Sequence, residues 1–234
     1  MLLEDGDAAV VLALVSPELG RGPLSVVVRG VPWERVRAGE AVRVAPGELA
    51  VGPVRVATAR AAAWNPQVPR VSLPASVLEA CVRWLVRAAP AESLASILPC
   101  LLDGAPAGGL LPWQRRALEG ARALASGELA AGSSMLCGLG PGLTPSGDDF
   151  LCGWMLAVHV RGRDPGPIAH HARSTHRIAR AYLEAAARGH ASEAWHRFLR
   201  AAAAGVWQAS ARSVLRAGET SGADTLAGFL AALR

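Results

Sequence analysis

The chain has 234 residues, of which 51% are hydrophobic and 18% are charged, so it can bury a sizeable core and is not intrinsically disordered. Its 24 basic residues are all arginine. Because lysine is absent, the chain cannot perform the phosphate-loop, protein-kinase or Schiff-base chemistries that depend on a lysine side chain.

The formal net charge is +5, but the arginines are spread along the chain and aromatic residues make up only 5% of it. Nucleic-acid-binding proteins usually concentrate basic charge on one face and interleave aromatic side chains. The N-terminal apolar run is short and follows acidic residues, unlike a signal peptide. The four cysteines form no CxxC pair. The sequence therefore predicts a cytoplasmic protein that binds neither nucleic acid nor a membrane.

The residue pattern in the first part of the chain is typical of β-strands. Short β-branched runs are separated by turn-forming glycines and prolines, and the expected strands cover residues 8–15, 24–28, 41–44, 48–51 and 54–58. Short strands with short turns predict a small, mostly antiparallel sheet or barrel. We expect a β-rich subdomain over residues 1–72.

Beyond this segment the hydrophobic spacing changes to that of helices. Pro74 opens a first helix, and a second is expected over 113–131, closed by Gly132. Further helices are expected over 148–160, 174–188, 192–204 and 206–217, with a short one from 222. Strands first and helices afterwards predict an α+β fold, with a mainly helical subdomain over 73–234.

A glycine-rich loop over residues 138–149 is the most informative segment of the sequence. It lies between an apolar, strand-like run at 135–137 and an apolar helix, and reads GLGPGLTPSGDD. Prolines stiffen such a loop, and successive backbone N–H groups before a helix N-terminus bind anions without a basic side chain. The alternative is an ordinary connection, with Ser146 and Asp149 forming a capping box.

The motif SGxDxLxG occurs twice, at 146–153 and again at 221–228. Either two helices with the same start face one site, each with an aspartate, or two unrelated helices carry similar caps. If the helices pair, Gly153 and Gly228 would allow their close approach. Two acidic groups weaken the attraction for an anion, a conflict that a divalent cation between Asp149 and Asp224 would remove. No cofactor other than this cation is indicated.

The glycine loop, together with STHRIARAYLEAAARGHASE and ETSGADTLAGF, resembles a bacterial family first described as a domain of unknown function. This family includes the AllH subunit of oxamate carbamoyltransferase, from allantoin breakdown. The resemblance implies a transferase subunit in a hetero-oligomer of different chains. It also implies that carbamoyl phosphate and oxamate, or a related small amide or ureido acid, are the substrates. The alternative is a non-catalytic scaffold or regulatory partner subunit.

The matching positions and the chemistry together give the candidate site residues. The aspartates are the catalytic candidates, namely Asp148, Asp149 and Asp224. The loop and the second motif supply the candidates for binding a small anionic substrate, with an arginine for its carboxylate: Gly140, Gly142, Thr144, Ser146, Gly147, Ser221, Gly222 and Arg177. For the arginine, an exposed position on a helix is an equally good explanation.

Overall fold

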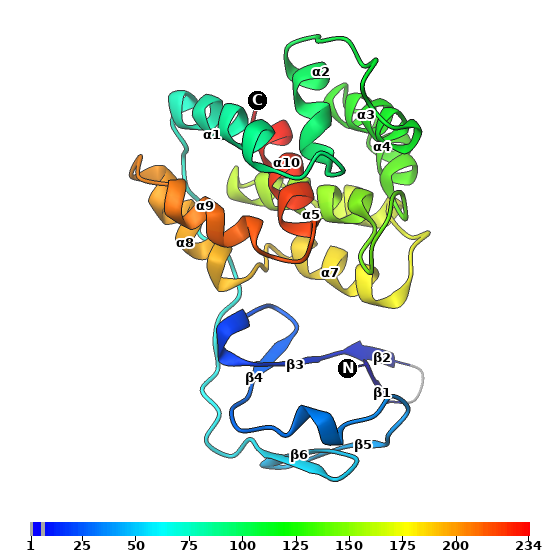
Figure 1. Ribbon diagram of the computed structural model, residues 1–234, viewed down its shortest axis with the longest axis vertical. Helices are drawn as coiled ribbons and strands as arrows, with labels where there is room; N and C mark the ends of the chain where they lie inside the picture. Colours follow the sequence, from blue (N-terminus) through cyan, green and yellow to red (C-terminus); the bar gives the residue numbers. More distant parts are fainter. Residues whose placement is uncertain (1, 6–7) are drawn as a thin grey trace. The chain divides into compact units, whose positions relative to one another are not determined.

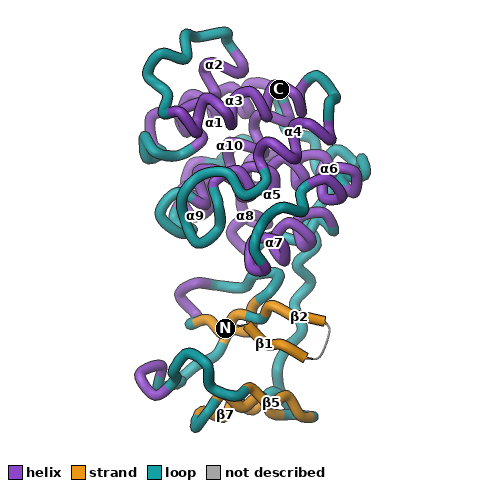
Figure 2. Tube along the Cα trace, turned by 90° about the vertical axis from the view of Figure 1, so that its right-hand side faces the viewer, coloured by secondary structure: helices purple, strands orange, loops and turns teal. Residues whose placement is uncertain are grey.

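The computed structural model describes residues 2–5 and 8–234, and the chain divides into two compact units, Met1–Asn65 and Pro66–Arg234. All the described strands lie in the first unit and all the described α-helices in the second (Figure 2). The predicted α+β class, with a sheet region before a mostly helical region, is confirmed. The division precedes residues 66–72, and the boundary expected after residue 72 stays a prediction.

The first unit contains three small sheets in place of the single sheet or barrel that the sequence predicts. Strand β1 (Leu2–Asp5) pairs antiparallel with β2 (Ala8–Val11), and β3 (Ala13–Val15) pairs parallel with β4 (Ser25–Val27). A connection that includes a 3₁₀ helix at Pro17–Leu19 allows the parallel pairing. The third sheet has the antiparallel order β5 (Val42–Ala45), β6 (Glu48–Val51) and β7 (Val54–Ala57).

The hairpin turns of the third sheet follow from the breakers in the sequence. Gly47 and Gly52 lie in the two-residue connections and have φ values of 79° and 51°. Positive φ is the left-handed conformation that two-residue hairpins require and that glycine adopts without strain. These turns place Leu49, Val51 and Val54 in the buried part of the unit.

The second unit is a helical bundle built around two central helices, α5 (Ser146–Val160) and α10 (Ser221–Leu233) (Figure 1). Most of their residues are buried, and Phe150 and Phe229 are fully enclosed. The other elements in chain order are α1 (Ala75–Ala88), a 3₁₀ helix at Leu94–Ile97, α2 (Leu98–Leu102), α3 (Pro112–Ala125), α4 (Leu129–Leu136), α6 (Gly166–His171), α7 (Arg177–Ala187), α8 (Glu193–Ala203) and α9 (Gln208–Leu215). No helix of residues 2–5 and 8–234 is both long and apolar enough to span a bilayer.

Three local expectations were wrong. The helix expected over 113–131 is two helices, because the chain turns at Gly127 with a φ of 89°. Gly132 does not end a helix, since it lies inside α4, where a Cβ would be 2.7 Å from the Gly120 carbonyl oxygen. The apolar run at 135–137 is the end of α4 and not a strand.

Candidate active site at the starts of two central helices

Helices α5 and α10 pack closely through the last glycine of each SGxDxLxG motif. A Cβ on Gly153 would overlap the Thr225 carbonyl oxygen of α10, and a Cβ on Gly228 would overlap the Phe150 carbonyl oxygen of α5. Each glycine therefore lies against the backbone of the other helix. The helix pairing that the repeated motif predicts is present.

The first glycine of each motif also has a packing role, and this role is the same in both motifs. A Cβ on Gly147 would overlap the carbonyl oxygen of Leu136, the last residue of α4. A Cβ on Gly222 would overlap the carbonyl oxygen of Val214 in α9. Both glycines are buried. Close packing against the preceding helix explains them, so we do not place them among the ligand-binding groups.

Asp148 fastens the glycine loop and the segment before α7 to α5. Its Oδ1 accepts a hydrogen bond from the Gly138 N–H at 3.0 Å, and its Oδ2 accepts one from the Thr175 hydroxyl at 2.6 Å. The side chain is 1% exposed. The predicted capping box is absent, because α5 has Pro145 as its N-cap and no side-chain cap bond. Asp148 therefore serves the structure of the loop.

Replacing Asp148 with alanine is expected to lower the free energy of unfolding by about 1–3 kcal/mol, because two partly buried hydrogen bonds, from the Gly138 N–H and the Thr175 hydroxyl, are lost. Chemical denaturation monitored by circular dichroism measures this loss. Thr175→Val, which removes one of the two hydrogen bonds, should cost roughly half as much. A loss below about 0.5 kcal/mol in the alanine variant would show that Asp148 does not hold the loop.

Thr144 connects the two helix starts. Its hydroxyl donates to Asp149 Oδ2 at 2.9 Å and lies 3.1 Å from the Ser221 hydroxyl. Asp149 belongs to the first turn of α5, and Ser221 is the first residue of α10. Thr144 and Ser221 are half-buried, whereas Asp149 is 8% exposed. The hydroxyls thus lie between the buried carboxyl and the surface.

Asp224 and Ser146 lie fully buried beneath this group. Asp224 Oδ1 accepts the Leu94 N–H at 2.6 Å, from the start of the 3₁₀ helix at Leu94–Ile97. Its Oδ2 and the Ser146 hydroxyl form no well-aligned hydrogen bond, although the Ser146 and Thr220 hydroxyls lie near enough to lower the pKa of Asp224. The side chains of both residues are 0% exposed. Two buried polar atoms without a well-aligned hydrogen bond are unusual in a folded protein.

Both carboxyl groups of the shared site hold their protons more tightly than usual. Burial raises the pKa of Asp149 to about 8; the Ser221 and Thr144 hydroxyls oppose the rise, and the Asp224 and Asp148 carboxyls add to it. Burial likewise raises the pKa of Asp224 to about 6, opposed first by the Leu94 N–H. Near neutral pH, Asp149 is therefore mostly uncharged.

The loop itself leaves backbone donors free. Gly140 and Gly142 have φ values of 95° and 107°, as the glycine pattern indicates. The N–H groups of Gly147, Asp148 and Asp149 in the first turn of α5 all bond to carbonyl oxygens of the loop or of Pro145. In contrast, four loop residues have an N–H that bonds to no described group: Gly140, Gly142, Leu143 and Thr144. The Ser146 N–H, at the first residue of α5, likewise bonds to no described group, so the free donors lie in the loop and at the very start of the helix.

Helix α7 borders the site on another side. Its Tyr182 has a raised pKa, first through burial and then through the nearby Asp149. Its first residue, Arg177, is exposed. Sequence reasoning did not single out Thr175 or Tyr182 as site residues, although both lie in the STHRIARAYLEAAARGHASE segment. The Leu94 N–H, the other missed group, had no sequence signal.

The described side chains do not form a metal centre or a reactive thiol. Within residues 2–5 and 8–234, no three His, Cys, Asp or Glu side chains are grouped to hold a metal ion, so we do not propose a cation between Asp149 and Asp224. Burial raises the pKa of Cys137 to about 12, and it raises that of Cys152 well above the ordinary value. These thiols stay protonated and are poor nucleophiles.

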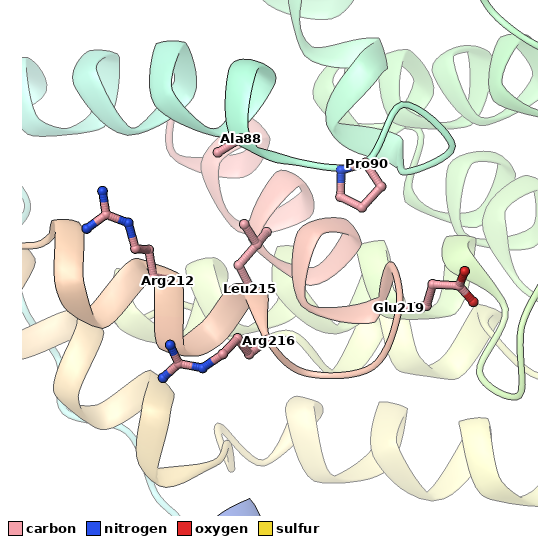
Figure 3. Close-up of a pocket in the computed structure, with 6 residues that line it drawn as sticks. All are labelled: Ala88, Pro90, Arg212, Leu215, Arg216 and Glu219. Atoms are coloured by element: carbon pink, nitrogen blue, oxygen red, sulfur yellow. The ribbon is translucent and has the colours of Figure 1, made fainter.

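A hollow of about 360 Å³ lies between the end of α1 and α9 (Figure 3). Its lining residues are Ala88, Pro90, Arg212, Leu215, Arg216 and Glu219. None of the predicted site residues lines it. The candidate site is therefore the polar group at the starts of α5 and α10, next to the glycine loop.

Residues 136–233 match the family model of the oxamate carbamoyltransferase subunit AllH, which confirms the resemblance expected from the sequence. The matched segment begins at the end of α4 and contains the glycine loop, α5 and nearly all of α10. No curated protein and no solved structure matches the chain significantly.

Proposed function

We propose that this chain is a subunit of a carbamoyltransferase that transfers the carbamoyl group of carbamoyl phosphate to oxamate or to a related small amide or ureido acid. The family match supports this proposal, because the matched residues contain every side chain of the candidate site. The observation that carries it is the Thr144 hydroxyl, which joins Asp149 of α5 to Ser221 of α10. Two copies of one motif thereby contribute to one site.

The glycine loop is the proposed binding element for the anionic end of a substrate. Its free N–H groups at Gly140, Gly142, Leu143 and Thr144 can donate to phosphate or carboxylate oxygens, or to the oxyanion that forms at the carbamoyl carbon. Arg177 at the start of α7 is the proposed partner for a carboxylate. We further propose that the enzyme is cytoplasmic, acts in allantoin catabolism and is completed by other subunits.

The proposal is tested by isolating the chain together with the proteins that it binds and measuring turnover. Phosphate release from carbamoyl phosphate should depend on oxamate, and mass spectrometry should detect carbamoylated oxamate. The same assay on the chain alone tells whether partner chains are needed. An assembly that consumes no carbamoyl phosphate with oxamate or related amides would contradict the proposal.

Gly142→Val is expected to reduce kcat/KM of the assembly by about 100-fold, because displacement of reacting groups by about 1 Å has effects of this size. Gly142 has a φ of 107°, and a Cβ would lie 2.9 Å from the Thr144 carbonyl oxygen, so the loop must move. Circular dichroism of the variant should show the wild-type helix content.

Gly127→Val is the matched control for this change. Gly127 also has a positive φ, of 89°, but a Cβ there meets nothing within 4 Å, and it lies in the α3–α4 turn. The control should lose stability and keep its turnover. If Gly142→Val also keeps wild-type turnover, the loop is not part of the site, and the chain acts as a scaffold or regulatory subunit.

A further inference from the structure

The group of side chains at the starts of α5 and α10 is rich in hydrogen-bond acceptors and has no basic member. The groups that act on the ionisation of Asp149 and Asp224 are hydroxyls, carboxyls and the Leu94 N–H. Among the described residues, no arginine or histidine contributes to holding either carboxyl charged. A phosphate or carboxylate placed here would meet two acids and no cation.

The two atoms without a well-aligned hydrogen bond have the same character. Asp224 Oδ2 is an acceptor, and Ser146 Oγ both accepts and donates. Nearer the surface, the Thr144 hydroxyl bonds Asp149 and lies beside the Ser221 hydroxyl, and both hydroxyls act on the Asp149 carboxyl, which keeps further lone pairs. Such a set is matched by a group that donates several hydrogen bonds and carries no negative charge.

We infer that this cluster of Thr144, Asp149 and Ser221, supported by Asp224 and Ser146 beneath, binds the uncharged –NH₂ end of the substrate, an amide or carbamoyl group, and not its anionic end. The inference rests on the proposed function and divides the substrate between two subsites. The anionic end is left to the free N–H groups of the loop. Thr144 belongs to both subsites, because its N–H is free and its hydroxyl bonds Asp149.

The hydrogen-bonding capacity of an amide, compared with that of a carboxylate, supports the division of the substrate between two subsites. An amide –NH₂ donates two hydrogen bonds, which Asp149 and a hydroxyl can accept, whereas a carboxylate oxygen in the same place has no proton to donate. A site built to bond an N–H group discriminates strongly against the analogue that lacks it, because its buried acceptors are then left unpaired.

Oxamate and oxalate provide the test, because they differ only in an –NH₂ group that is replaced by an oxygen. In the wild-type assembly at pH 9, above the Asp149 pKa of about 8, this carboxyl can only accept hydrogen bonds. We then expect oxamate to bind at least 10-fold more tightly than oxalate, measured by calorimetry and by inhibition of turnover. In Asp149→Asn, whose side-chain amide can donate to oxalate, this preference should fall at least 10-fold. Ser221→Ala keeps both carboxyls and should lower the preference for oxamate at least 3-fold. It provides the test if Asp149→Asn does not fold.

Asp148→Asn is the matched control. It makes the same chemical change at the neighbouring position, but both oxygens of Asp148 are occupied by the Gly138 N–H and the Thr175 hydroxyl. Its preference for oxamate should stay within about 3-fold of the wild type. An unchanged preference in folded Asp149→Asn and in Ser221→Ala would overturn the inference.

The outcomes also separate the inference from the proposed function. If the wild-type assembly turns over oxamate and the variants keep the preference, the function stands and the amide subsite is wrong. If no turnover occurs but oxamate binds over oxalate in a manner that depends on Asp149, the subsite stands and the reaction is wrong. If the wild type binds oxalate as well as it binds oxamate, the amide subsite is wrong.

Discussion

Replacing Gly153 with alanine is expected to destabilise the protein by about 3 kcal/mol or more, at the upper end of the cost of overpacking a core. The added methyl group would overlap the Thr225 carbonyl oxygen and would lie 2.8 Å from the Phe229 backbone nitrogen. These contacts are backbone atoms of a buried helix, so no side chain can rotate away. The midpoint of thermal or urea unfolding measures the loss.

Gly108→Ala is the control for this change, since a Cβ on Gly108 meets nothing within 4 Å. This variant should unfold within about 0.5 kcal/mol of the wild type. If Gly153→Ala is as stable as Gly108→Ala, the close packing of α5 and α10 is not as the structure describes it.

Asp149→Asn is expected to become more stable relative to the wild type as the pH rises from 5 to 8. In the wild type, the pKa of Asp149 is about 8 in the folded state, against 3.8 as the ordinary value. The folded state therefore holds a proton that the unfolded state releases, and stability falls as the pH rises from about 4 through 8. The asparagine side chain does not take up a proton in this pH range, so the free energy of unfolding of the variant does not fall with pH for this reason.

The change in the stability difference between pH 5 and pH 8 should be about 3–4 kcal/mol, since each of these three pH units costs the wild type up to about 1.4 kcal/mol. Urea denaturation at several pH values measures it. The exposed Asp103 supplies a control, because Asp103→Asn makes the same chemical change outside the site and is measured at the same pH values. A stability difference for Asp149→Asn that is independent of pH would mean that this carboxyl is ionised in the folded protein.

The sequence predicts the fold well where the signals are local. Alternating β-branched runs and glycine turns give strands β5 to β7 within one residue, and helical periodicity gives α5, α7, α8 and α9 within three residues at each end. The sequence-based prediction is wrong where tertiary packing determines the secondary structure. The run at 135–137 is apolar in either conformation, and Gly132 ends no helix because its neighbour is the backbone of α3.

The candidate site shows the same limit. The repeated motif predicts that Asp149 and Asp224 belong to paired helices, because a repeat of this kind is visible in one chain. It does not predict that the Leu94 N–H bonds Asp224 or that Thr175 bonds Asp148, since these partners come from segments without a distinctive pattern. It also interprets Gly147 and Gly222 as ligand-binding, because a glycine needed for packing looks the same in sequence as one needed for a ligand.

The close packing of α5 and α10 at Gly153 and Gly228 restricts how this protein can evolve. Each glycine faces backbone of the other helix, so a larger residue at either position cannot be offset by a smaller side chain across the interface. The glycine loop has no such restraint at its exposed positions, Pro141 to Leu143. Distant relatives with other substrates should therefore differ in the loop and retain both glycines, each four residues after its aspartate.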